Sequence, residues 1–90
     1  MKTVFKYQLR YPGEKDSFSI NLPRDWKPLA VAMQKGNYQL WALIDYTQVY
    51  IPIHFIWHGT GHPVAYNEEH IATLQEPPFV WHLFYERMGD

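Results

Sequence analysis

The chain has 90 residues, of which 47% are hydrophobic and 18% aromatic, and its eight basic and nine acidic side chains leave a net charge of −1. This length predicts one domain over residues 1–90, and the aromatic content excludes a disordered polypeptide. The balanced charge lacks the basic face of proteins that bind duplex nucleic acid. The sequence also has no cysteine, no secretory signal and no apolar run of about 20 residues, so it predicts neither disulfides nor a membrane-bound protein.

Apolar and polar residues alternate along the first part of the chain. Residues 3–11 and 17–22 show this alternation, which is typical of half-buried strands, and the Pro12-Gly13 turn between them predicts that the two form a hairpin. A third strand is expected over residues 29–34, where apolar side chains again alternate. The first third of the chain therefore predicts β-structure alone.

The middle of the chain predicts a second hairpin. Lys35-Gly36-Asn37-Tyr38 is typical of a tight two-residue turn, because glycine and asparagine tolerate positive φ. The fourth strand, over residues 38–45, is apolar on both faces, which predicts a central position in its sheet. Residues 47–57 predict a long fifth strand, and Pro52 has no N–H, so that strand is expected to lie at an edge or to carry a bulge there.

The last part of the chain predicts shorter elements. Residues 58–63 hold two glycines and a proline and are expected to form a loop. A helical turn is predicted over residues 66–70, a short strand over 71–74 and a final strand over 79–86. About seven mostly antiparallel strands with at most one short helical turn predict an all-β fold, either a small barrel or a two-layer sandwich.

Three motifs give the chain a family resemblance. They are Leu-Trp-Ala-Leu-Ile-Asp at 40–45, Gly-Thr-Gly-His-Pro at 59–63 and Pro-Phe-Val-Trp-His-Leu-Phe at 78–84. With Phe5-Lys6-Tyr7 and Leu22-Pro23, they make most of the chain similar to an uncharacterised family of small bacteriophage proteins. The resemblance implies a phage accessory protein acting in the host bacterial cytoplasm, and it implies no activity. Residues 46–54 match no motif of this family.

Five histidines raise the question of a metal site. His54, His58 and His62 are four residues apart, which would align them on a helix. On a strand, however, residues with this spacing lie about 13 Å apart, too far to share one ion. We therefore expect no metal and no cofactor, and we expect His54 and His58 to project outward from a strand.

The sequence gives little support to an enzyme. Ser17 and Ser19 lie on a predicted solvent face without a His–Asp pair nearby, and the acidic residues form no recognised acid–base pairing. A non-enzymatic protein is favoured. The alternative is a hydrolytic activity with His62 or His82 as the general base.

The glycine loop is the candidate ligand site. Its backbone N–H groups are able to converge on a phosphate or a carboxylate; the other interpretation is a tight turn that His62 caps. His82 is expected either to contact the ligand or to make a structural hydrogen bond, and Trp81 to lie in the core. Nearby aromatic rings are expected to stack on a base, and an arginine to neutralise a phosphate. The complete predicted ligand-binding set is Gly59, Thr60, Gly61, His62, Trp57, Tyr66, His82 and Arg24.

These residues favour a binding function. The first hypothesis is a phage accessory protein of counter-defence that sequesters a small nucleotide-derived signalling molecule. The second is a protein inhibitor of a host defence or transcription enzyme, and the third is a minor structural protein of the phage. The many aromatic residues also predict a homo-oligomer, because tyrosine and tryptophan are enriched at interfaces.

Overall fold

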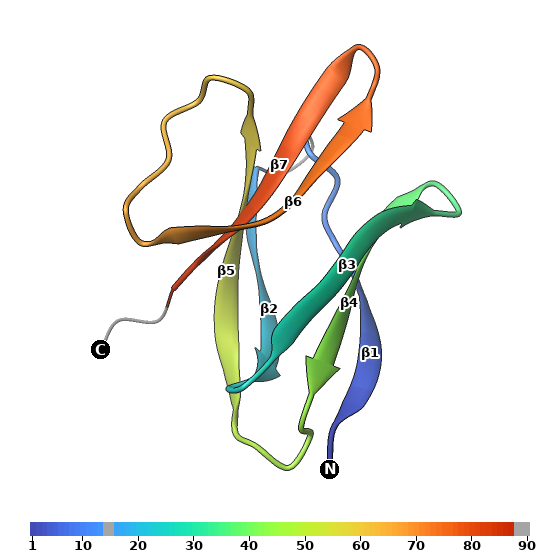
Figure 1. Cartoon of the computed structure of the whole chain (residues 1–90), viewed down its shortest axis with the longest axis vertical. Coiled ribbons are helices and arrows are strands. Elements are labelled where there is room, and N and C mark those ends of the chain that lie inside the picture. The colour runs from blue at the N-terminus through green and yellow to red at the C-terminus, as the bar shows by residue number, and fades with distance from the viewer. Residues whose placement is uncertain (14–15, 88–90) are drawn as a thin grey trace.

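The computed structural model describes residues 1–13 and 16–87, and these residues form seven antiparallel strands in two sheets without a helix (Figure 1). The strands are β1 (Thr3–Gln8), β2 (Ser17–Pro23), β3 (Lys27–Gln34), β4 (Asn37–Ile44), β5 (Tyr50–Gly59), β6 (Glu68–Glu76) and β7 (Phe79–Glu86). The predicted all-β class is confirmed, and the arrangement is a sandwich rather than a closed barrel. No helix that could cross a membrane is present in the part of the chain that the structure describes.

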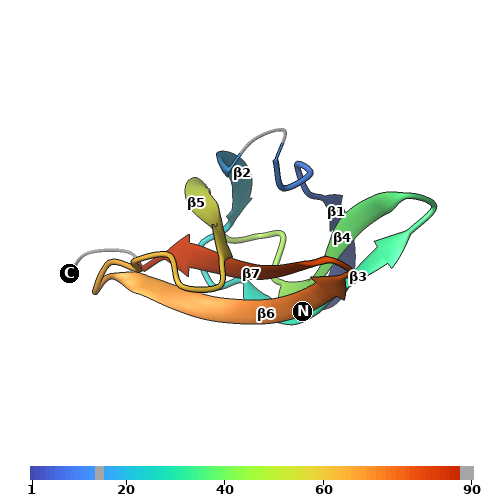
Figure 2. The same cartoon turned by 90° about the horizontal axis from the view of Figure 1, so that it is seen from above.

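Two sheets of different width make up the sandwich. The three-stranded sheet has the order β1-β4-β3, and the four-stranded sheet has the order β2-β5-β7-β6. The four-stranded sheet curves, so that β6 comes against β3 on one side of the molecule (Figure 2). The edge strands β1 and β2 lie on the other side, and the core fills the space between the sheets.

The predicted hairpin between the first two strands is wrong. Strand β1 pairs with β4, and β2 pairs with β5, so the chain crosses from one sheet to the other between them. Alternation decides which face of a strand is buried, but it does not decide which strand lies beside it. Strand β1 also ends at Gln8 rather than at residue 11, although the Leu9 N–H still donates to the carbonyl of Tyr38 at 2.9 Å.

The β3–β4 hairpin forms as predicted, with its turn one residue earlier. Gln34 pairs with Asn37, so Lys35 and Gly36 are the two central residues. Their φ angles are 53° and 81°, and two positive values identify a type I′ turn. Strand β4 is central in its sheet, as expected, and its inward side chains at Leu40, Ala42 and Ile44 have no exposed surface.

This turn offers a stabilising substitution. Lys35→Asn is expected to raise the free energy of unfolding by up to about 1 kcal/mol, because asparagine tolerates the left-handed conformation better than lysine. Urea denaturation measures the change. Gly36→Ala should lower stability by about 1 kcal/mol, and since nothing lies within 4 Å of a Cβ at Gly36, this cost is one of backbone conformation alone. Unchanged stability in both variants would contradict the type I′ turn.

Among the described residues, the segment of β5 around Pro52 pairs with β2 only. Strand β5 runs between β2 and β7, yet its pairing with β7 begins at Phe55. Trp57 N–H donates to the Asp16 carbonyl on the β2 side, so the odd-numbered residues of β5 direct their polar groups towards β2. The backbone nitrogen of Pro52 therefore points to the side of β5 on which β7 lies, at a position before the paired segment that begins at Phe55. Within the part of the chain that the structure describes, the prediction of an edge at Pro52 is confirmed.

The structure changes two further boundaries. Residues 66–67 form a turn rather than the start of a helical turn, and β6 is paired with β7 from Glu68 to Glu76. Strand β7 is long enough to pair with this whole segment, and the hydrogen bonds of that pairing stabilise a strand more than any local helical preference stabilises a helix. Strand β5 begins at Tyr50 rather than at residue 47, because the Gln48 N–H donates to the Asp45 carbonyl at 3.0 Å and closes a turn.

The core consists of apolar side chains from both sheets. Phe55 is fully buried and stacks on Phe18, with ring centroids 5.6 Å apart, while Trp26 meets it edge-on at 5.7 Å. Trp57 is 3% exposed, and its Nε1–H donates to the Arg10 carbonyl at 2.8 Å. The buried hydrophobic residues are Leu9, Leu22, Tyr38, Leu40, Ala42, Ile44, Ile53, Phe55, Trp57 and Leu83.

Candidate ligand-binding site

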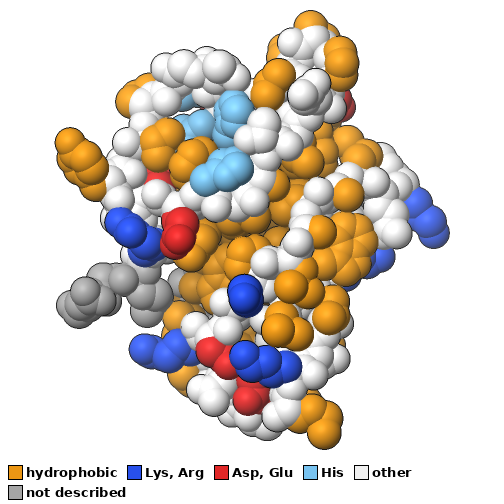
Figure 3. Space-filling view, in the orientation of Figure 1, with side chains coloured by type: hydrophobic (Ala, Val, Ile, Leu, Met, Phe, Trp, Pro, Cys, Tyr) orange, Lys and Arg blue, Asp and Glu red, His pale blue; other side chains and the backbone are white. Residues whose placement is uncertain are grey.

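The outer face of the four-stranded sheet gathers the histidines. Because Phe55 and Trp57 of β5 point into the core, the even-numbered residues His54 and His58 lie on the outer face, as predicted. His82 of β7 is the cross-strand partner of His58, so it lies on the same face. Figure 3 shows histidine side chains grouped on one region of the surface.

A row of hydrogen bonds runs across this face. The Thr60 hydroxyl lies 2.9 Å from Nε2 of His82, and the Thr73 hydroxyl lies 2.9 Å from Nδ1 of the same ring. Thr73 also lies 2.9 Å from Nε2 of His70. A hydroxyl both donates and accepts, so these bonds suit either neutral tautomer of His82. We call this row, consisting of Thr60, His82, Thr73 and His70, the hydroxyl–imidazole chain.

Beside the hydroxyl–imidazole chain, His58 and Glu68 form a polar pair at the end of the 60–67 loop. Nε2 of His58 lies 2.6 Å from Oε1 of Glu68, and their side chains are 13% and 10% exposed. The other oxygen of Glu68 accepts from the Ala65 N–H at 3.1 Å. Burial raises the pKa of Glu68, but the hydrogen bonds from His58 and Ala65 together lower it by more than burial raises it. The pKa of Glu68 therefore lies below its ordinary value. The pair ties the end of the 60–67 loop to β5.

The glycine loop is a tight turn capped by His62. The His62 N–H donates to the Gly59 carbonyl at 3.1 Å, and Gly61 has a φ of 92°, as the third residue of a type II turn requires. The Gly59 N–H donates to Nδ1 of His62 at 3.2 Å, so this N–H is already engaged. These contacts match the tight-turn interpretation, and the turn presents Thr60 to His82.

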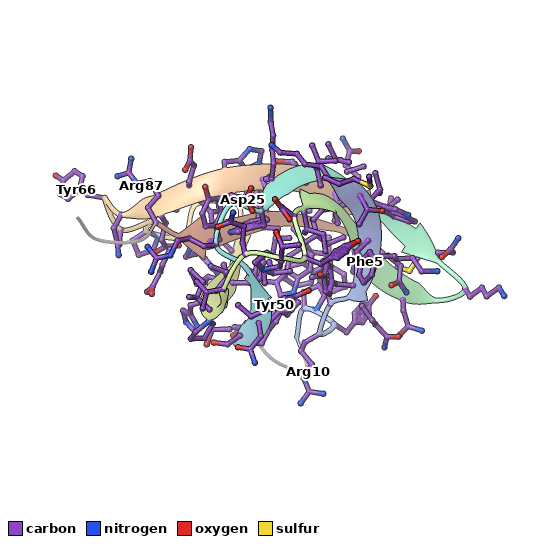
Figure 4. All side chains as sticks on the ribbon, turned by 90° about the horizontal axis from the view of Figure 1, so that it is seen from below. Phe5, Arg10, Asp25, Tyr50, Tyr66 and Arg87 are labelled. Carbon is purple, nitrogen blue, oxygen red and sulfur yellow. The ribbon has the colours of Figure 1, made fainter. Side chains whose placement is uncertain are left out.

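The structure brings five of the eight predicted residues together and leaves three apart. Trp57 lies in the core, on the face of β5 opposite to His58. Arg24 follows β2, where its N–H bonds to the Val49 carbonyl, and the ten residues of β5 put it about 30 Å from the loop. Tyr66 is fully exposed and projects away from the molecule (Figure 4), while its carbonyl accepts from Arg87.

Sequence reasoning missed Thr73, His70 and Glu68. Thr73 lies opposite His82 in the β6–β7 register, and this pairing aligns its hydroxyl with the imidazole. His70 and Glu68 lie in the segment where a helical turn was expected. The alternation of residues 79–86 indicated that His82 lies on the face of β7 opposite to Trp81. To identify Thr73 and His70 as its neighbours, the pairing of β6 with β7 must also be known.

This geometry suits binding of an oxyanion. The hydroxyl–imidazole chain offers hydroxyl and imidazole groups on the outer face of the sheet. Both nitrogens of His82 bond to hydroxyls rather than to a carboxylate, which differs from a Ser-His-Asp arrangement. Within residues 1–13 and 16–87, no three His, Asp or Glu side chains are placed to hold a metal ion.

Comparisons with known proteins place the chain in a family without a known role. A family model described as a domain of unknown function, DUF7352, matches residues 1–89. No curated protein and no solved structure matches the chain.

Proposed function

The chain belongs to the DUF7352 family of domains of unknown function, and from its own geometry we propose that it is a non-enzymatic protein that binds a small phosphate-bearing ligand at the hydroxyl–imidazole chain. The resemblance to small bacteriophage proteins supports an accessory role in the host cytoplasm. There it would sequester a nucleotide-derived signalling molecule as a counter-defence.

The position of His82 is the observation that carries this proposal. Its ring is held at both nitrogens by hydroxyls, one from the glycine loop and one from β6. The groups are therefore already oriented, which lowers the entropy lost on binding. Phosphate oxygens accept hydrogen bonds from hydroxyl groups, and His82 holds the Thr60 and Thr73 hydroxyls in place. Thr60, which is exposed, provides the entry to the chain.

Calorimetric titration with cyclic nucleotides and ADP-ribose derivatives tests the proposal. We expect one member of this panel to bind and to raise the melting temperature, because a ligand that binds only the folded state stabilises it. His82→Ala should weaken binding at least about tenfold, because it removes the ring that holds the Thr60 and Thr73 hydroxyls in position. Gly61→Val should abolish binding, because valine disfavours the φ of 92° on which the position of Thr60 depends.

His54→Ala is the matched control. His54 lies on the same face but near Ser19, at 3.4 Å, rather than in the hydroxyl–imidazole chain, so its loss should have little effect. Equal losses from His54→Ala and His82→Ala would show that the site lies elsewhere. No binding across the panel, with a host protein recovered by pull-down, would instead favour the protein-inhibitor alternative. The half-exposed Val4 and Leu29 of the three-stranded sheet would supply apolar contacts for that role.

A further inference from the structure

Strand β1 has a free edge. It ends the three-stranded sheet, and among the described strands only β4 pairs with it. The bond from the Leu9 N–H to the Tyr38 carbonyl shows that odd-numbered residues direct their polar groups towards β4. By alternation, the N–H and C=O groups that point away from the sheet belong to Val4, Lys6 and Gln8.

Apolar side chains flank this free edge on both faces. Phe5, labelled in Figure 4, lies opposite the buried Ala42 and so on the inner face, yet it is 47% exposed. Val4 lies on the outer face and is 52% exposed. A hollow of about 280 Å³ opens beside Phe5, and it is lined by Met1, Lys2, Thr3, Phe5 and Tyr46. Unpaired backbone groups next to exposed apolar side chains are the features of a strand that pairs with another chain.

We propose that two copies of this chain associate by antiparallel pairing of their β1 strands, with the two-fold axis at Phe5. The two three-stranded sheets then become one continuous sheet. The backbone N–H and C=O groups of Val4 bond to those of Lys6 in the second copy, because the polar groups of both residues point to the free edge. Phe5 lies against Phe5 of the second copy, and Thr3 lies against its Tyr7.

Charge selects this register. Residues whose N–H and C=O groups point to the free edge must lie opposite residues of the same kind in the second copy. Two registers meet this condition and pair most of Thr3–Gln8, one centred on Phe5 and the other on Lys6. Centring on Lys6 would set each Lys6 directly against its copy, which is unfavourable. Centring on Phe5 pairs Lys6 with Val4 and Lys2 with Gln8, so no lysine faces a lysine, and it adds an aromatic pair at the axis. The register centred on Phe5 therefore avoids like-charge contacts and is compatible with two-fold symmetry.

Cysteine cross-linking tests the register directly, because the chain has no cysteine of its own. At the two-fold axis, the Cα atoms of Phe5 and its copy would lie about 4.5 Å apart, within the reach of a disulfide. Phe5→Cys is therefore expected to give a covalent dimer under mild oxidation. Gln8→Cys lies on the same edge but about 20 Å from its copy, and it should remain a monomer on a non-reducing gel. Equal cross-linking of the two variants, or cross-linking of Gln8→Cys alone, would overturn the proposal.

Charge variants at Val4 give a second test that leaves Phe5 in place. In sedimentation velocity, Val4→Glu should tighten the dimer about 5-fold, because two Glu–Lys6 pairs form, and Val4→Lys should weaken it by a similar factor. High salt should reduce both effects. Leu29→Glu and Leu29→Lys are the controls, since Leu29 of β3 is 50% exposed in the same sheet away from β1. A wild-type protein that stays monomeric at its highest soluble concentration, or changes of the same sign in both Val4 variants, would refute the dimer.

The dimer and the ligand site are tested separately. Strand β1 belongs to the three-stranded sheet, whereas the hydroxyl–imidazole chain lies on the outer face of the four-stranded sheet. The Val4 variants should therefore leave binding to the nucleotide panel unchanged, and His82→Ala should leave the dimer unchanged.

Discussion

Replacing Phe55 with alanine is expected to lower the free energy of unfolding by about 3–5 kcal/mol, the usual cost of removing a buried phenyl ring. Phe55 has no exposed surface, and it contacts Phe18 and Trp26. Both neighbours belong to other segments that pack on β5, so a cavity here would weaken contacts on two sides. A domain of this size has about 5–15 kcal/mol of stability in total, so a large part of it would be lost. Urea denaturation at neutral pH measures this loss.

Phe79→Ala is the matched control for this prediction. Phe79 is 55% exposed and stacks on Trp81 with ring centroids 5.4 Å apart. Its removal should cost less than about 1 kcal/mol, because water already contacts much of the ring and the aromatic pair contributes little more. If the two variants lost the same stability, the core would not be centred on Phe55.

The buried faces of the strands were predictable because alternation is a local property. Phe55 and Ile53 share one parity in the sequence, and both lie in the core. The partner of each strand was not predictable in the same way. β1 and β2 satisfy their alternation equally well as a hairpin or in separate sheets, and the second arrangement is the one found. Only the β3–β4 pair, which a positive-φ turn specifies locally, could be derived from the sequence.

The part of the site that the glycine turn forms was predictable from the sequence. The part that depends on how β5, β6 and β7 pair was not. The glycines of the 59–62 turn indicated a bend, which the structure contains. Trp57 was assigned to the ligand site because it lies close to the loop in sequence, although it has the same parity as Phe55 and therefore lies in the core. The link between Thr60 and His82 joins residues 22 positions apart and depends on the pairing of β5 with β7. The contact of His82 with Thr73 depends on the β6–β7 register, which no local pattern specified.

Replacing Glu68 with alanine is expected to cost about 1–3 kcal/mol, because the change leaves polar groups without an acceptor in a place that water reaches poorly. Both oxygens of Glu68 are used, one by the His58 ring and one by the Ala65 N–H. The 60–67 loop should then open first, which hydrogen exchange at Ala65 would detect as faster exchange. Exchange at Ala65 that stays as slow as in the wild type would show that the loop is held by other contacts.

The pH dependence of stability isolates the charge of Glu68 from its shape. Its pKa in the folded chain lies below the ordinary value of 4.5 that it has when unfolded. A lowered pKa means that Glu68 contributes fully above that ordinary value and loses this contribution as the pH falls through the folded value. Between about pH 6 and about pH 3, the wild type should therefore lose more stability than Glu68→Gln, which has no proton to gain. Asp25→Asn makes the same change at an exposed turn and corrects for the loss of one negative charge. If the wild type and Glu68→Gln lost stability in parallel, the carboxylate would not be what fastens the loop to His58.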